Sequence, residues 1–215
     1  ATGAGVDRID FSNDLATASV RGPLSSAKYD LGATSGQAKS SSIRLQKAGN
    51  FGWFGPGSFA GSLVSTVDRI DFSNDSATAS PRGPLSLART QLAATGNSNY
   101  GWFGGGSAPS VPGTVTRVDR IDFSNDLATA SPRGPLSLSR NFLTATGNSD
   151  FGWFGGGINP STNPVTTVDR IDFANDSATA SVRGTLSQAR NGLSATGNSN
   201  YGWFGGGFAP SIPGR

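Results

Sequence analysis

Cysteine and histidine are both absent from this chain of 215 residues. Without cysteine there is no disulfide framework, no thiol nucleophile and no thiolate metal site. Without histidine the chain lacks the commonest general base and the commonest ligand of transition metals. Acid–base catalysis would have to rely on aspartate. The sequence therefore predicts no catalytic group, no metal site and no cofactor.

Glutamate is absent too, and lysine is scarce. All 14 acidic residues are aspartate, and only three of the 17 basic residues are lysine. Glutamate and lysine favour helices, whereas the abundant Thr, Ser, Gly and aromatic residues favour strands and turns, so we expect an all-β fold. The net charge of +3 and the even spread of arginine argue against nucleic-acid binding. No apolar run approaches the ~18 residues of a membrane span, so we expect no membrane insertion.

The chain does contain one unit that is repeated four times. The motif VDRIDF begins at Val6, Val67, Val118 and Val168, and each copy ends with GWFG, at Gly52, Gly101, Gly152 and Gly202. Self-similarity at a fixed period of this size indicates a repeat architecture. We expect a single domain over residues 1–215, with repeats at approximately 6–66, 67–117, 118–167 and 168–215. Repeat one alone carries an insertion of 12 residues, before Trp53.

Each repeat is predicted to hold four short strands separated by turns. In repeat two the expected strands are Val67–Phe72, Ala77–Ser80, Thr90–Thr95 and Tyr100–Phe103. Asn and Asp side chains favour a turn after the first strand. Pro81 and Pro84 argue against regular pairing in the loop after the second strand. The alternation of short strands and turns is typical of a β-meander.

The order of these features resembles the kelch repeat. In repeat three the likeness rests on Val118–Phe123, the turn residue Asn125, the segment Pro135–Arg140, and the aromatic and double-glycine stretch Trp153–Gly156. It extends over nearly the whole chain. The resemblance implies a β-propeller in which each blade begins at the apolar strand and not at VDRIDF.

On that division the two ends of the chain carry complementary halves of one blade. The chain opens with two outer strands, Val6–Phe11 and Ala16–Ser19, and closes with two inner strands, Leu193–Thr196 and Tyr201–Phe204. We therefore predict a four-bladed kelch-like propeller closed by N- and C-terminal strands that share one blade, because closure removes exposed sheet edges. Two alternatives stay open: the chain is part of a longer array, or several chains complete a larger ring.

Two sets of basic residues flank the loop that enters each blade, and both are candidate ligand-binding residues. The first set follows the second strand and the second set precedes the apolar strand. They are, respectively, Arg21, Arg82, Arg133 and Arg183, and Lys28, Arg89, Arg140 and Arg190. The kelch resemblance implies that this loop lies on the binding face, where a ring of cations would bind a carboxylated or sulfated glycan or an acidic protein patch. The alternative is that these bases pair with the recurring aspartates, because arginine suits either role.

Three further features have both a functional and a structural interpretation. The insertion carries Lys39, Arg44 and Lys47 and no acid, and we expect it either to contact a partner or to be a tolerated hairpin extension. The Trp–Phe pair of each repeat could stack on sugars, but the neighbouring glycines favour packing between blades. The alternating Asp and Arg residues, with the aspartate of the following turn, could suggest a calcium site, but their spacing does not match the calcium-loop pattern. Their near-equal numbers favour ion-pair ladders and turn hydrogen bonds.

The repeats are also similar to tandem repeats in surface and tail proteins of marine phages and algal viruses. That resemblance implies a non-enzymatic virion component, located at the virion surface or outside the cell. It would bind a host cell-surface glycan or protein, or a neighbouring virion protein. The alternatives are a secreted lectin-like propeller that binds glycans and a glycan hydrolase that uses paired aspartates.

Overall fold

The computed structural model describes residues 4–13, 15–35, 50–109 and 113–210 of the chain. These residues form strands β1 to β18 and one short 3₁₀ helix, η1 (Phe173–Asn175). The predicted all-β class is confirmed. The basic insertion residues Lys39, Arg44 and Lys47 lie outside the described residues.

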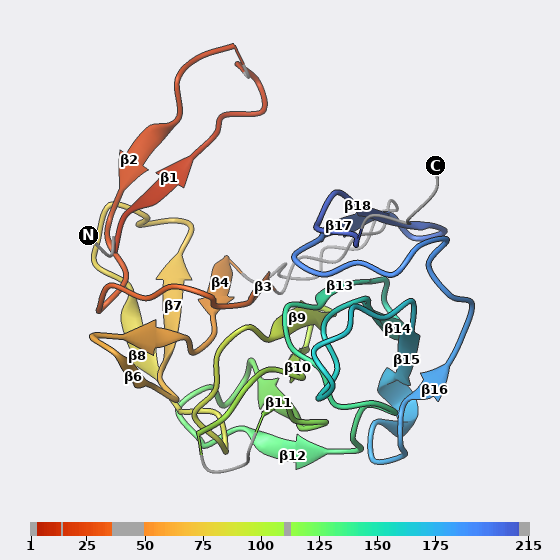
Figure 1. Ribbon diagram of the computed structural model, residues 1–215. Helices are drawn as coiled ribbons and strands as arrows, with labels where there is room; N and C mark the ends of the chain where they lie inside the picture. The colour runs from red at the N-terminus through yellow and green to blue at the C-terminus, as the bar shows by residue number, and fades with distance from the viewer. Residues whose placement is uncertain (1–3, 14, 36–49, 110–112, 211–215) are drawn as a thin grey trace.

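Three four-stranded antiparallel sheets form the body of the molecule (Figure 1). The first sheet consists of β3 (Ala33–Ser35), β4 (Phe51–Phe54), β7 (Val67–Asp71) and β8 (Ser80–Arg82). The second consists of β9 (Ala93–Gly96), β10 (Tyr100–Gly104), β11 (Val118–Asp122) and β12 (Ser131–Arg133). The third consists of β13 (Thr144–Gly147), β14 (Phe151–Gly155), β15 (Val168–Asp172) and β16 (Ser181–Val182). Each sheet takes two strands from one VDRIDF repeat and two from the next, as predicted.

The two ends of the chain form separate two-stranded sheets. The N-terminal pair is β1 (Val6–Arg8) with β2 (Ser19–Arg21), and the C-terminal pair is β17 (Ser194–Gly197) with β18 (Gly202–Gly205). Another small pair, β5 (Ser58–Phe59) with β6 (Ser62–Leu63), follows β4. Figure 1 shows an open arc with β1–β2 at one end and β17–β18 at the other. The blade predicted to be shared by the two ends is not formed among the described residues, so the closed ring is not confirmed.

The outer strand of the first sheet lies further along the chain than predicted. β8 comprises Ser80–Arg82 and includes Pro81, which faces Asp68 across the ladder. An edge strand tolerates proline because the missing N–H would point to solvent. The backbone N–H of Ala79, expected in a strand, donates instead to the carbonyl of Pro23 from the preceding loop, at 2.8 Å. The segment before β8 therefore links neighbouring sheets.

The core lies between neighbouring sheets. Trp53 and Trp102 are buried, as are Phe103 and Phe154 from the same aromatic–glycine strands. Phe103 packs on Gly55 of the first sheet, and Phe154 packs on Gly104 of the second. The predicted packing role of the Trp–Phe pairs is confirmed in these sheets. Trp153 of the third sheet is only partly buried, and Trp203 of the C-terminal pair has 53% of its surface exposed.

Candidate functional site

A cleft of about 670 Å³ opens between the turn ends of the first and second sheets. Its walls include the rings of Phe51, Tyr100 and Phe123 and the carboxylates of Asp71 and Asp122. The two acids are the last residues of β7 and β11. Because Asp71 faces Phe51 across its ladder and Asp122 faces Tyr100, each sheet brings one aromatic ring and one acid to the cleft.

The carboxylates are oriented by the turns that follow their strands. Oδ1 of Asp71 accepts hydrogen bonds from the backbone N–H of Ser73 at 2.9 Å and from its hydroxyl at 2.5 Å. Ser124 makes the same two bonds to Asp122. The Ser73 hydroxyl, followed by its backbone N–H, holds the pKa of Asp71 below its usual value. These contacts confirm the predicted turn hydrogen bonds.

The aromatic rings of the cleft are held by cations and by a second ring. The guanidinium of Arg69 lies 4.1 Å from the centroid of Phe51, and that of Arg120 lies 4.3 Å from the centroid of Tyr100. Phe123 stacks on Trp53 with 3.8 Å between centroids. Both cations also bind carboxylates of the neighbouring sheet, so the rings are fixed before any ligand arrives.

Short polar side chains complete the cleft. Asn50, Asn99, Ser73 and Ser124 all line it. The amides and hydroxyls both donate and accept hydrogen bonds, whereas the ionised carboxylates only accept them. Aromatic surface beside carboxylates and amides suits a ligand with apolar C–H faces and many hydroxyl groups.

Three of the four residues of the first predicted basic set form ion pairs between sheets. The Nε atoms of Arg21, Arg82 and Arg133 lie 3.3, 3.6 and 3.5 Å from carboxylates of the following sheet. Those carboxylates belong to Asp75, Asp126 and Asp176. The side chains remain partly exposed, so part of their surface is open to a ligand. Arg183 is exposed and has no ion pair within the described part of the chain.

Most of the second set is buried in structural ion pairs. Lys28 contacts Asp68 at 2.8 Å, and in the next two sheets Arg89 contacts Asp119 at 2.6 Å and Arg140 contacts Asp169 at 2.9 Å. All six side chains have no exposed surface.

The binding role predicted for Lys28, Arg89 and Arg140 is therefore corrected. A ligand cannot reach these side chains, and the alternative pairing with aspartate is confirmed for them. Burial lowers the pKa of Arg89 and Arg140, and the adjacent carboxylates act in the opposite direction. Arg190, the fourth member, is half-buried, and its guanidinium donates to the carbonyl of Gly206 at 3.4 Å.

Sequence reasoning assigned Asp71 and Asp122 to structure and gave Asn99 and Tyr100 no binding role. Nothing in one repeat marks these residues as a site, because the cleft forms only where two sheets meet. One signal was present: the last copy has Ala174 where the two cleft-forming copies have Ser73 and Ser124. That difference removes one of the two serine hydrogen bonds, since Asp172 accepts only from the N–H of Ala174.

The described part of the chain has neither a cluster of metal-ligating side chains nor a membrane-spanning helix. It contains no group of three or more acidic, His or Cys side chains placed to hold a metal ion. None of its helical segments has the length and apolar character that a membrane crossing requires.

A scan against models of protein families found no match for this sequence. A search of curated protein sequences found no significantly similar protein.

Proposed function

We propose that this protein is a non-enzymatic attachment protein of a virus particle. It binds a neutral glycan of the host-cell surface in the cleft between its first two complete sheets. The observation that supports this function is the chemistry of the cleft, where Phe51, Tyr100 and Phe123 accompany Asp71 and Asp122. The likeness of its repeats to those of phage and algal-virus tail proteins supports the placement on a virion.

A neutral glycan fits the cleft better than a sulfated or carboxylated one. The two carboxylates that line the cleft would repel an anionic sugar, and Arg69 and Arg120 are already paired with acids of the neighbouring sheet. Sugar hydroxyls can instead donate to the carboxylates and exchange hydrogen bonds with Asn50 and Asn99. This assignment replaces the anionic ligand suggested by the arginine pattern.

We further propose that the complete sheets are blades of a kelch-like propeller. Each has four antiparallel strands joined in a meander, with its neighbour packed face to face across aromatic residues. In this proposal the exposed turns of each blade form the host-facing surface. Neighbouring proteins of the virion make further contacts with this protein, and the remaining arginine residues of the first set contribute to them.

A glycan array tests the binding function directly. We expect binding to neutral oligosaccharides, and we expect Asp122→Asn to weaken it roughly tenfold, because a hydrogen bond to a charged group contributes about 1.5–3 kcal/mol. The matched control is Asp172→Asn, which makes the same change at the equivalent position of the third sheet, away from the cleft. Equal loss in both variants, or binding to sulfated glycans alone, would contradict the proposal.

Two observations separate this function from its alternatives. Electron microscopy of purified particles should place the chain at the virion surface, whereas a secreted lectin would be absent from particles and a capsid-interior position would exclude attachment. The hydrolase alternative draws on the two carboxylates of the cleft. It requires a proton donor with a raised pKa, whereas the pKa of Asp71 is lowered by Ser73. Release of reducing sugar that Asp122→Asn abolishes would establish the hydrolase instead.

A further inference from the structure

The two end pairs of strands are complementary halves of the complete sheets. In each complete sheet the aromatic strand (β4, β10 or β14) pairs with an inner strand on one side and with the VDRID strand on the other. Within the described residues, β18 has the same aromatic sequence but pairs only with β17, and β1 has the VDR sequence but pairs only with β2. Each half therefore has one unpaired strand edge, and the equivalent edge in the complete sheets is paired.

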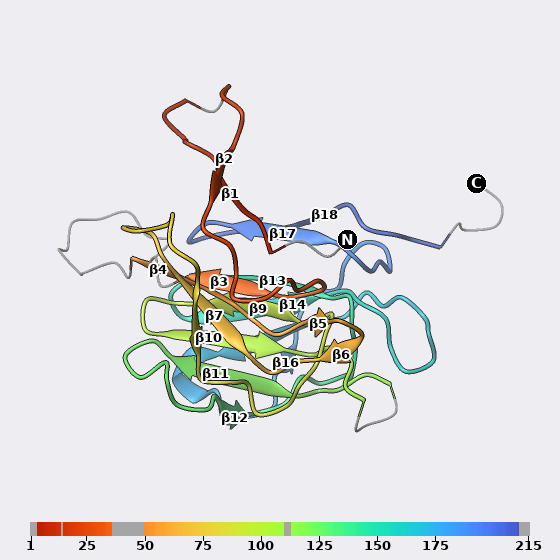
Figure 2. The ribbon, with the colours of Figure 1, turned by 90° about the vertical axis from the view of Figure 1, so that its left-hand side faces the viewer.

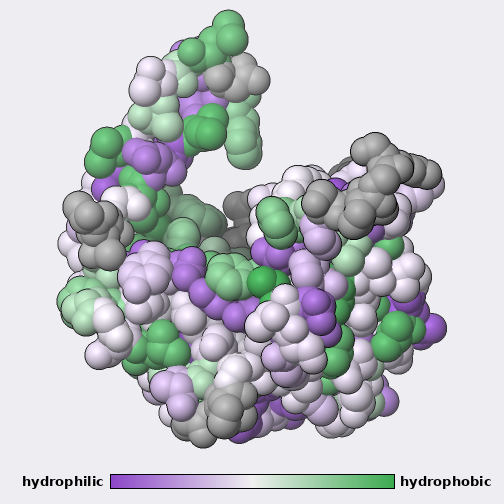
Figure 3. Space-filling model, viewed as in Figure 1, coloured by the Kyte–Doolittle hydropathy of each residue, from purple (hydrophilic) through white to green (hydrophobic). Residues whose placement is uncertain are grey.

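Both halves are anchored at opposite ends of the arc. At the C-terminal end, the N–H of Gly157 donates to Arg190 O at 2.9 Å, which repeats the bond of Gly106 to Arg140 O between complete sheets. At the N-terminal end, the N–H of Gly22 donates to Asp75 O at 2.7 Å. Figures 1 and 3 show a gap between the two ends. Joining β18 to β1 of the same chain would disturb this repeated spacing of sheets.

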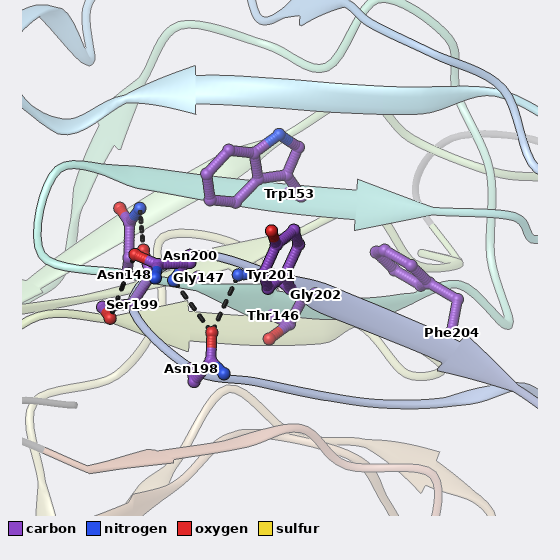
Figure 4. Close-up of a pocket in the computed structure, with 10 residues that line it drawn as sticks. All are labelled: Thr146, Gly147, Asn148, Trp153, Asn198, Ser199, Asn200, Tyr201, Gly202 and Phe204. Atoms are coloured by element: carbon purple, nitrogen blue, oxygen red, sulfur yellow. Dashed lines mark hydrogen bonds between the residues drawn. The ribbon is translucent and has the colours of Figure 1, made fainter.

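The C-terminal half contains an empty socket for an aromatic side chain. In the third sheet, Phe173 lies over Gly152 and stacks on Trp102 of the preceding sheet, with 3.8 Å between centroids. The equivalent residues here are Gly202 of β18 and Trp153 of β14, and they line a cavity of about 250 Å³ that no phenylalanine of this kind fills among the described residues (Figure 4).

The residue that matches the socket is Phe11, which follows the first VDRID motif. It is 93% exposed in this chain, although its counterparts at 123 and 173 are packed against the core. The C-terminal half thus lacks one aromatic side chain, and the N-terminal half presents an exposed phenylalanine that matches it.

The N-terminal half lacks the reciprocal groups. Trp53 stacks on Phe123 of the next sheet and donates from Nε1 to Asp126 at 2.9 Å. The corresponding residues in the first sheet are Phe72, a ring that is 43% exposed, and the carboxylate of Asp75. Neither contacts a tryptophan within the described residues. Trp203, exposed on β18, is the residue that would supply this contact.

The charges of the two halves are also complementary. In the complete sheets a base before the inner strand pairs with the aspartate of the VDRID strand, as Arg140 does with Asp169 at 2.9 Å. At the ends, Arg190 has no carboxylate partner among the described residues, and Asp7 is exposed on β1. The same register would bring this cation and this anion together.

We propose that β1–β2 of a second copy of this chain pairs with β18 and completes a four-stranded sheet between two molecules. The register of β10 with β11 places Tyr201 of one copy opposite Asp10 of the other, and Trp203 opposite Arg8. Phe11 then fills the socket on Trp153. Because the contact is head-to-tail, each added copy presents the same open edge again, and the assembly is a ring or a filament.

Engineered cysteines test the pairing without background, because the chain has no cysteine. Mixing a Tyr201→Cys chain with an Asp10→Cys chain under mild oxidation should give a disulfide-linked dimer, since opposed strand residues lie within disulfide range. The double variant Tyr100→Cys, Asp122→Cys is the positive control. It places the same residue pair inside one complete sheet and should form an intramolecular bond.

A second variant isolates the socket from the strand edge. Light scattering should give masses that are multiples of 21.9 kDa, and Phe11→Ser should raise the dissociation constant at least tenfold. Leu15→Ser is the matched control: Leu15 is even more exposed, and its counterparts in repeats two and four are already Ser76 and Ser177. It should leave association unchanged.

Three results would overturn the proposal. The chain remains a monomer at every concentration, Phe11→Ser and Leu15→Ser weaken association equally, or a chain carrying both Tyr201→Cys and Asp10→Cys forms only an intramolecular bond. The last result would show that the ends of one chain close on each other. A folded state for each variant is established by the fluorescence of the buried tryptophans.

Discussion

At the scale of single residues, the buried aspartate of each VDRID strand organises its sheet. Asp169 accepts from the N–H and hydroxyl of Ser137 at 3.1 and 2.6 Å and binds Arg140 at 2.9 Å. Arg140 in turn donates to the carbonyl of Phe154 at 2.9 Å. The cluster ties the entering loop to two strands. A buried charge is tolerated here because its partners satisfy it, and it becomes costly when one partner is lost.

We therefore expect Asp169→Asn to destabilise the fold by about 3–5 kcal/mol, because it leaves the buried guanidinium of Arg140 without a counter-charge. The control is Asp172→Asn, three positions along on the same strand, where the side chain is exposed and the cost should stay within about 0.5 kcal/mol. Urea unfolding measured by tryptophan fluorescence compares the two. Equal midpoints would show that the buried pair contributes nothing particular.

The sequence predicted that the Asp and Arg residues form ion pairs, but it did not predict which pairs are buried. Near-equal numbers of Asp and Arg in each repeat indicated ion pairs, and the pairs are present. Which pairs are buried could not be read from the sequence. Arg82 and Arg89 belong to the same repeat, but Arg89 binds Asp119 of the sheet that it enters and Arg82 reaches Asp126 of the sheet that follows its own.

At the scale of the elements, neighbouring sheets meet where a glycine after the outer strand touches the turn of the following sheet. The N–H of Gly134 donates to Asp176 O at 2.8 Å. A Cβ at Gly134 would overlap the carbonyl oxygen of Ala178. The glycine is needed because the backbones approach each other too closely for any side chain.

Gly134→Ala should therefore destabilise the protein by about 1–3 kcal/mol, since the two sheets must separate to admit the methyl group. The repeat provides its own control at Gly184, where a Cβ would meet nothing within 4 Å. Gly184→Ala should change the free energy of unfolding by less than about 0.5 kcal/mol in the dilute monomer. Thermal unfolding of both variants distinguishes them, and a similar loss at the two positions would contradict this account.

The strand order followed from the sequence, whereas the strand limits did not. Turn residues and aromatic strands identified four strands per repeat, but the small-residue segment before β8 contained no signal that it would bond to a neighbouring sheet. The cleft was missed for the same reason. Asp122 and Phe51 are 71 positions apart in sequence and share a cleft only because their sheets are adjacent.

At the scale of the whole molecule, the spacing of repeats indicated that the chain ends in two halves of one sheet. It did not indicate the rotation between successive sheets. That rotation depends on contacts such as Phe154 on Gly104 and Trp102 on Phe173, which set how closely two sheets approach. With these contacts the two halves stand apart at the ends of an open arc (Figure 2 gives the side view).

An arc of this kind should not be uniformly stable. Each repeat of such an architecture contacts only its neighbours, so its local stability depends on how many neighbours it has. Among the described residues, the second sheet is covered on both sides, whereas β1–β2 and β17–β18 are each covered on one side and have an open edge. In dilute solution, backbone amides of the end pairs should exchange with solvent at least about tenfold faster than those of β10 and β11.

Hydrogen exchange measured over a range of protein concentrations links this gradient to assembly. Amides of β18 should become protected as concentration rises, because the edge pairs with β1 of another copy, while those of β10 should not change. The variant Phe11→Ser should keep β18 in fast exchange at the same concentrations, since its socket stays empty. Protection of β18 that is high and independent of concentration would mean instead that the edge is already covered within one chain.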